Sequence, residues 1–126
     1  MNSGIKTTDE QIEKYTNLKV NRTNTYMICS INENLDGLVI EKLGDKGASY
    51  QEMVDQLPKD DCRYVIMDLE YETNENPPRK TSKLVLFLWA PISTKTKRKF
   101  TFAASNDGLK KAFQGIQKEI QVTIFY

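Results

Sequence analysis

Basic side chains are the residues of this chain whose number and spacing could do chemistry. Nine of the 18 lysines and arginines fall between Arg79 and Lys111, where the only acid is Asp107. The net charge of +1 therefore divides into +8 inside this segment and −7 outside it. Such a concentration of charge predicts a basic surface that binds an acidic partner. The nine bases are Arg79, Lys80, Lys83, Lys95, Lys97, Arg98, Lys99, Lys110 and Lys111.

Patterns for catalysis or metal binding are missing from the sequence. The chain has no histidine, which is the commonest general base, and two isolated cysteines cannot form a structural zinc site. Neither a GxxxxGK[ST] nor a GxGxxG phosphate loop occurs. The carboxylates Asp60–Asp61 and Glu70–Glu72 have no nucleophile or base beside them, so we interpret them as surface charges. We expect a binding protein and not an enzyme, with no cofactor and no metal.

Length and composition indicate one small domain spanning residues 1–126. The hydrophobic share of 39% and the charged share of 28% are typical of a soluble domain. No segment approaches the roughly 20 apolar residues of a membrane span, and the N-terminus lacks the apolar core of a signal peptide. We therefore expect a cytoplasmic protein, with Cys29 and Cys62 as buried thiols.

Hydrophobic periodicity predicts eight elements in the order α β β α β β α β. That order favours an α/β fold (an α+β mixed sheet), in which about five strands form a central sheet with helices on both faces. The last strand–helix–strand passage predicts a right-handed parallel crossover. The predicted elements are a helix from Thr7–Thr8 to Leu18, strands at Tyr26–Ile31 and Leu38–Leu43, a helix over Ser49–Gln56 with Tyr50, Met53 and Val54 inward, a strand at Cys62–Tyr71, a loop at Glu72–Ser82, a strand at Lys83–Ala90, a helix over 93–115 ended by Gly115, and a strand at Ile120–Tyr126.

The helix predicted over 93–115 has two distinct faces. At about 100° per residue from Lys97, the apolar residues cluster on a face centred near 110°, namely Leu109, Ala112, Phe113 and Ile116. Phe100 points elsewhere, beside Asp107 and Lys111. Two interpretations are open: Phe100 packs against a neighbouring strand ahead of a kink near Ser105, or it is the apolar centre of a charged interface. We favour the interface because three bases directly precede it.

Several segments share a pattern with a known family. Lys97–Lys111 reads KRKFTFAASNDGLKK and is similar to the pattern K-x-K-M-x-Y-A-S-S-K-D-A-L-K-K. The segments Asp61–Thr73 and Lys83–Pro91 match in the same order, and the start MNSGI is similar to M-x-S-G-V. Together they resemble the actin-depolymerising factor/cofilin family from the N-terminal arm to about Gln121.

The resemblance implies a fold, partners and sites. The fold is a single actin-depolymerising-factor homology domain with gelsolin-like architecture. The function is binding to actin monomers, with preference for the ADP form, and turnover of actin filaments in the cytoplasm and cytoskeleton. The implied monomer-binding residues are Ser3, Gly4, Ile5, Lys97, Lys99, Phe100, Lys110 and Lys111. The implied filament-binding residues are Arg79, Lys80 and Lys83.

The family also implies regulation of the same surface. Ser3 occupies a position that a kinase phosphorylates, and phosphatidylinositol bisphosphate binds the bases of the helix. Here these are Lys97, Arg98, Lys99, Lys110 and Lys111. We expect a monomeric protein that does not bind nucleic acid, because no groove-reading helix or stacking-aromatic sheet motif accompanies the bases.

Two departures from the family pattern affect these expectations. Phe replaces Met at position 100, although its apolar character is kept. Family members usually continue past the EIQ segment into a terminal helix, whereas this chain ends at Tyr126. If that end is natural, we expect filament severing to be weaker than monomer binding. Two alternatives stay open: a filament-only actin binder of the coactosin type, or a basic module that binds phosphoinositides or membrane surfaces.

Overall fold

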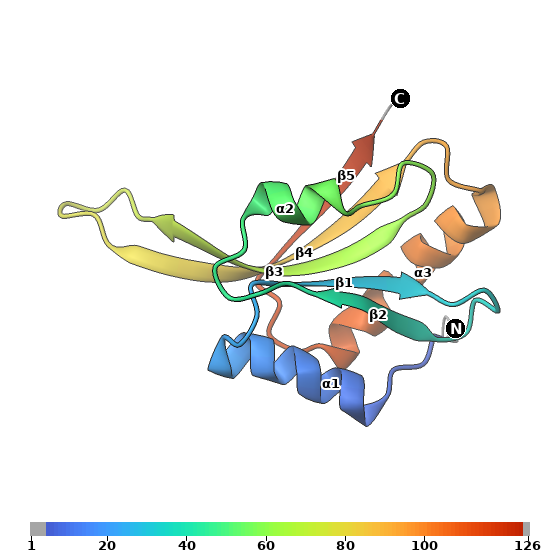
Figure 1. Cartoon of the computed structure of the whole chain (residues 1–126), viewed down its shortest axis with the longest axis horizontal. Helices are drawn as coiled ribbons and strands as arrows, with labels where there is room; N and C mark the ends of the chain where they lie inside the picture. Colours follow the sequence, from blue (N-terminus) through green and yellow to red (C-terminus); the bar gives the residue numbers. More distant parts are fainter. Residues whose placement is uncertain (1–4, 125–126) are drawn as a thin grey trace.

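The structure, a computed structural model, describes residues 5–124, which contain a five-stranded mixed sheet. The strands lie in the order β2-β1-β3-β4-β5, and neighbours are antiparallel except for β4 and β5, which run parallel (Figure 1). Their bounds are β1 Tyr26–Ile31, β2 Leu38–Leu43, β3 Arg63–Glu72, β4 Lys80–Pro91 and β5 Lys118–Ile124.

Helices cover both faces of this sheet, with α1 and α3 on one face and α2 on the other (Figure 1). Thr8 begins α1 through a capping box with Gln11, which is the second of the two predicted spacings, and Ser49 caps α2. The fold class predicted from the element order is therefore confirmed. The bounds are α1 Asp9–Thr16, a π-helical turn η1 Asn17–Asn21, α2 Tyr50–Asp55 and α3 Thr96–Ala112.

The core lies on both sides of β1, whose six residues are all buried. Met27, Cys29 and Ile31 face the cluster under α1 and α3, whereas Tyr26 and Ile28 face the cluster under α2. A strand buried on both faces explains why this segment is apolar without alternation. Cys29 and Cys62 are buried and unpaired, as predicted.

The β3–β4 hairpin is longer than predicted. The cross-strand ladder continues to the pair Glu72↔Lys80, so Lys80–Ser82 belong to β4 and not to the preceding loop. Opposite charges facing each other at that pair favour the extension. The prediction for Tyr50 is wrong in part: it is the first residue of α2, and its side chain lies 47% exposed with its ring 6.1 Å from that of Phe87.

Helix α3 is shorter than predicted at both ends. The segment before it forms a turn, in which the Thr94 N–H donates to the Pro91 carbonyl at 3.1 Å, and Lys95 has extended backbone. The helix therefore begins at Thr96. It ends before Gly115, whose positive φ of 101° turns the chain toward β5. Among residues 5–124, no helix is both long and apolar enough to cross a membrane.

Candidate functional site

Phe100 lies on the outer face of α3 and is 71% exposed. Three apolar residues of the same helix are buried on its inner side: Phe102, Leu109 and Phe113. Phe102 packs at 4.9 Å against the ring of Tyr64, so the inner face is held firmly on the sheet. The exposure excludes the interpretation in which Phe100 packs against a strand. It leaves a large apolar side chain in water, and such residues commonly mark interfaces.

The surface around Phe100 is made of small residues and bases. Small exposed residues follow it along the helix at three- and four-residue spacing, namely Ala103, Ala104 and Gly108. Lys97 and Lys111 lie on the same side, both exposed, and neither forms an ion pair within residues 5–124. A partner could therefore approach the helix closely between two cations. We call Lys97, Phe100 and Lys111, with the small residues between them, the helix surface.

Two further lysines of α3 already have partners. The Lys99 ammonium donates to the Ile92 carbonyl at 3.1 Å, which holds it beside the turn before the helix. Lys110 is 2.6 Å from a carboxylate oxygen of Glu119 on β5 and 3.4 Å from Asp107. The hydrogen bond to Glu119 raises the pKa of Lys110 above its usual value. Glu119 and Asp107 therefore partly neutralise the charge of Lys110, whereas Lys111 forms no ion pair within residues 5–124.

Arg98 differs from its neighbours, although the sequence analysis grouped it with them as an anion-binding residue. Its guanidinium turns to the inner side of α3 and forms two bonds to Asp61, at 2.8 and 3.0 Å. It also donates to the carbonyl of Ile31 at 3.1 Å and lies over the Phe102 ring. The structure therefore separates Arg98 from the exposed bases. Periodicity held the signal, because Arg98 falls at about 100° from Lys97, in the middle of the apolar face.

Asp61 also departs from its expected role as a surface charge. Its side chain is 20% exposed, and Arg63 reaches it at 2.5 Å in addition to Arg98. Arg63 in turn pairs with Glu41 on β2 at 2.6 Å. Burial alone raises the pKa of Asp61, but the hydrogen bonds and charges of the two arginines outweigh it and hold the pKa below its usual value. Sequence gave no signal for this network, since Glu41 and Arg98 are far along the chain from Asp61 and Arg63.

The N-terminal arm reaches the same end of the molecule as the start of α3. Ser3 and Gly4 lie outside the described residues, but Ile5 packs against the core under α1 and α3. The Lys6 N–H donates to the carbonyl of Asp36 at 2.9 Å, and the Lys6 carbonyl accepts from Leu38. Leu38 pairs with Ile31, whose carbonyl binds Arg98. The β1–β2 turn therefore links the arm to the start of α3.

Arg79, Lys80 and Lys83 lie apart from α3 on the β3–β4 hairpin, where Lys80 and Lys83 point to opposite faces of β4. The hairpin projects from the sheet on the side away from the N-terminal end of α3 (Figure 1). Arg79 is 3.4 Å from Glu75, and the Lys83 ammonium lies 5.7 Å above the ring of Tyr71. The single basic segment of the sequence thus divides into two surfaces, and we call this one the hairpin surface.

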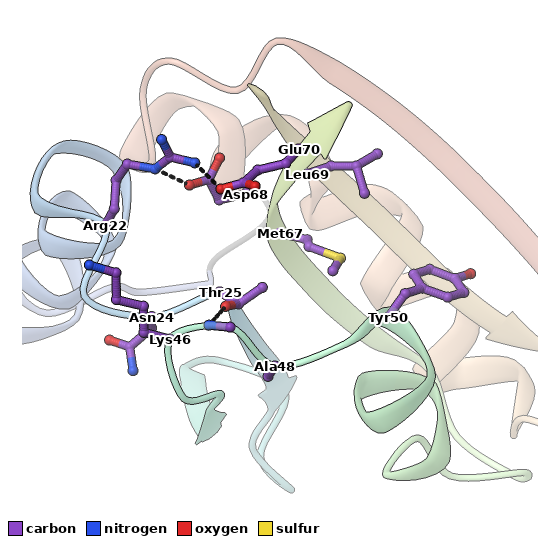
Figure 2. A pocket seen from close by; sticks show the side chains of 11 residues that line it. Arg22, Asn24, Thr25, Lys46, Ala48, Tyr50, Met67, Asp68, Leu69 and Glu70 are labelled. Carbon is purple, nitrogen blue, oxygen red and sulfur yellow. Dashed lines mark hydrogen bonds and ion pairs between the residues drawn. The ribbon is translucent and has the colours of Figure 1, made fainter. Parts of the chain in front are cut away.

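A groove of about 410 Å³ lies beside β3, and sequence reasoning did not find it. Figure 2 shows Arg22 at one side, bonded to Asp68 at 2.7 Å and to Glu70 at 3.0 Å, with Met67 and Tyr50 farther along. Its main charges are paired, and none of the predicted site residues lines it. Within residues 5–124, no cluster of His, Cys, Asp and Glu could hold a metal ion. The groove therefore offers no evident chemistry, and the helix surface remains the stronger candidate.

Comparisons with known proteins point to one family. The family model described as cofilin/tropomyosin-type actin-binding protein matches residues 4–125. A cofilin from Mycosarcoma maydis is 38% identical over 99% of this chain and 88% of its own length. The crystal structure of a Streptomyces griseoflavus cofilin is 36% identical with a TM-score of 0.84, covering 96% of this chain and 87% of that one. The crystal structure of Plasmodium berghei actin depolymerization factor 2 is 31% identical with a TM-score of 0.88, covering 98% and 89%.

Proposed function

This chain belongs to the family of cofilin/tropomyosin-type actin-binding proteins, and on that premise we propose that it binds actin and promotes filament disassembly. The relatives named cofilin and actin-depolymerizing factor match it over nearly the whole chain. The observation that carries the proposal is the exposure of Phe100 between Lys97 and Lys111 on α3. An apolar side chain surrounded by cations suits an acidic surface with an apolar cleft.

We assign the two basic surfaces to two kinds of contact. The helix surface, with Ile5 and the preceding residues Ser3 and Gly4, binds the actin monomer together with Lys99 and Lys110. The hairpin surface of Arg79, Lys80 and Lys83 contacts a second subunit in the filament. Their placement supports this division, because the hairpin projects away from the N-terminal end of α3 (Figure 1).

The finer properties follow from the same assignment. The protein acts as a monomeric domain of residues 1–126 in the cytoplasm, at the actin cytoskeleton, and it works by binding and not by catalysis. It prefers ADP-actin and exchanges actin for phosphatidylinositol bisphosphate at the exposed lysines of α3. Phosphorylation of Ser3 would place negative charge near these lysines and repel an acidic partner.

Filament disassembly tests the proposal directly. Pyrene-labelled actin filaments should lose fluorescence faster with the wild-type protein than without it. The variant Lys110→Ala/Lys111→Ala should slow this loss and also weaken inhibition of nucleotide exchange on monomers. A protein that binds anionic vesicles but has no effect on either actin assay would instead be the membrane-surface module. Binding to filaments without binding to monomers would identify a coactosin-type protein.

A further inference from the structure

The first turn of α3 has an unfavourable composition for the start of a helix. Its N-cap is Lys95, no side chain caps the free N–H groups, and no acid lies in the first turn. Lys97, Arg98 and Lys99 follow within that turn. Positive charge near a helix N-terminus opposes the helix dipole, and an uncapped terminus frays. The turn that presents the helix surface therefore needs stabilisation from outside the helix.

Asp61 supplies that stabilisation through Arg98. The two bonds between them are 2.8 and 3.0 Å long, and the side chains are only 20% and 21% exposed. Paired bonds of this kind fix direction as well as distance, which a lysine cannot do. Arg63 and the Cys62 N–H hold Asp61 in place in turn, at 2.5 and 3.0 Å. The carboxylate is thus a fixed anchor and not a mobile counter-ion.

Arg98 and Phe100 point to different sides of α3. At about 100° per residue, two positions place the side chains roughly 160° apart around the helix. Arg98 reaches inward to Asp61 and to the Ile31 carbonyl at the end of β1, while Phe100 and Lys97 point to solvent. Rotation or fraying of this turn would move Phe100 and Lys97 together.

We propose that Arg98 is a positioning residue, which through Asp61 fixes the first turn of α3 and so presents Lys97 and Phe100 to the partner without touching it. The identity of the partner, actin, rests on the proposed function. The ordering of the first turn of α3 by Arg98 and Asp61 does not depend on it. It also removes Arg98 from the bases that bind phosphoinositides.

A double-mutant cycle distinguishes positioning from direct contact. The variants are Arg98→Ala, Asp61→Asn and the two combined, with dissociation constants for monomeric actin as the readout. We expect each single change to weaken binding about tenfold, and the pair to weaken it no more than either alone. Lys97→Ala, an exposed neighbouring base, is the matched control, and its loss should multiply with that of Asp61→Asn. If the losses from Arg98→Ala and Asp61→Asn also multiply, Arg98 contacts actin itself and the inference is wrong.

Amide hydrogen exchange without actin provides an independent readout. Residues 99–101, whose N–H groups are the first of α3 to have helical partners, should exchange at least about tenfold faster in Arg98→Ala and in Asp61→Asn, but not in Lys97→Ala. Unchanged exchange in the first two variants would overturn the positioning role. If the wild type fails to bind actin at all, the proposed function falls while this measurement still decides the present inference.

A conservative variant covers the case in which Arg98→Ala folds poorly. Arg98→Lys keeps the charge but cannot form the paired bonds to Asp61. A positioning role predicts faster exchange in the first turn and weaker actin binding in Arg98→Lys. Retention of wild-type affinity and exchange by this variant would overturn the inference, because charge alone would then be sufficient.

Discussion

Truncation of Phe100 should weaken actin binding strongly while leaving the fold intact. A phenylalanine side chain buries about 150–250 Å² when it is enclosed, and 71% of this one is available to a partner. At about 25 cal/mol per Å², enclosing that surface contributes roughly 3–4 kcal/mol, of which an alanine side chain retains part. We therefore expect Phe100→Ala to raise the dissociation constant for monomeric actin by about 30- to 150-fold, which corresponds to ~2–3 kcal/mol.

The free energy of unfolding should change little, because an exposed side chain away from the core contributes within about 0.5 kcal/mol. Competition with a fluorescently labelled actin monomer gives the dissociation constant, and urea denaturation gives the stability. Phe100→Met replaces the ring with an unbranched apolar side chain and should stay within about threefold of the wild type. Val20→Ala is a matched control, since Val20 is 64% exposed on η1, far along the chain from α3.

Two results would refute this reasoning. If Phe100→Ala bound actin within about twofold of the wild type, the aromatic ring would not be enclosed by the partner, and charge alone would account for recognition. If Val20→Ala lost as much affinity as Phe100→Ala, removal of any exposed apolar side chain would weaken binding, and Phe100 would have no specific role. Either outcome would remove the apolar centre from the helix surface.

Three further predictions concern other parts of the molecule. Reversing the hairpin charges in Lys80→Glu/Lys83→Glu should weaken filament binding in co-sedimentation at least about fivefold and leave the affinity for monomers within about twofold of the wild type. Equal losses in both assays would contradict two separate surfaces. Glu119→Gln removes the carboxylate that pairs with Lys110. In stopped flow, this variant should associate with actin about two- to threefold faster than the wild type at low salt and at the same rate at high salt. The absence of a salt-dependent difference would count against electrostatic steering by α3. Burial raises the pKa of Tyr15 to about 12, so the unfolded chain loses this proton at lower pH than the folded chain, and the free energy of unfolding falls as the pH rises above about 10. Between about pH 9 and pH 11, urea denaturation should show that Tyr15→Phe loses about 1 kcal/mol less of its free energy of unfolding than the wild type. Equal losses would assign the pH dependence to another group.

Sequence predicted the elements well where burial alone decides conformation. The bounds of β1 were right because its apolar run is flanked by polar residues on both sides. The exposure of Phe100 was predictable because a helix of 17 residues keeps its phase over several turns. The start of β4 was missed because Lys80–Ser82 are polar, and their strand conformation depends on pairing with β3.

The candidate site was predictable in its position but not in the roles of its bases. Charge composition treats Lys97 and Arg98 alike, although one step along the helix turns them to different sides. The anchor Asp61 lies 37 positions from Arg98 in sequence, and no local pattern relates two residues so far apart. Similarly, only the folded chain shows that the hairpin bases and the α3 bases are distant from one another. Tertiary packing of α3 on the sheet and pairing of the strands determine these last two features.

The half-buried row of alternating charges from Glu41 through Arg63 and Asp61 to Arg98 has a consequence for reversibility. Salt screens exposed charges strongly and enclosed pairs much less. Raising the ionic strength should therefore release a bound partner from Lys97 and Lys111 while the helix that carries them keeps its orientation. The protein can therefore release its partner and bind it again many times without a refolding step in between.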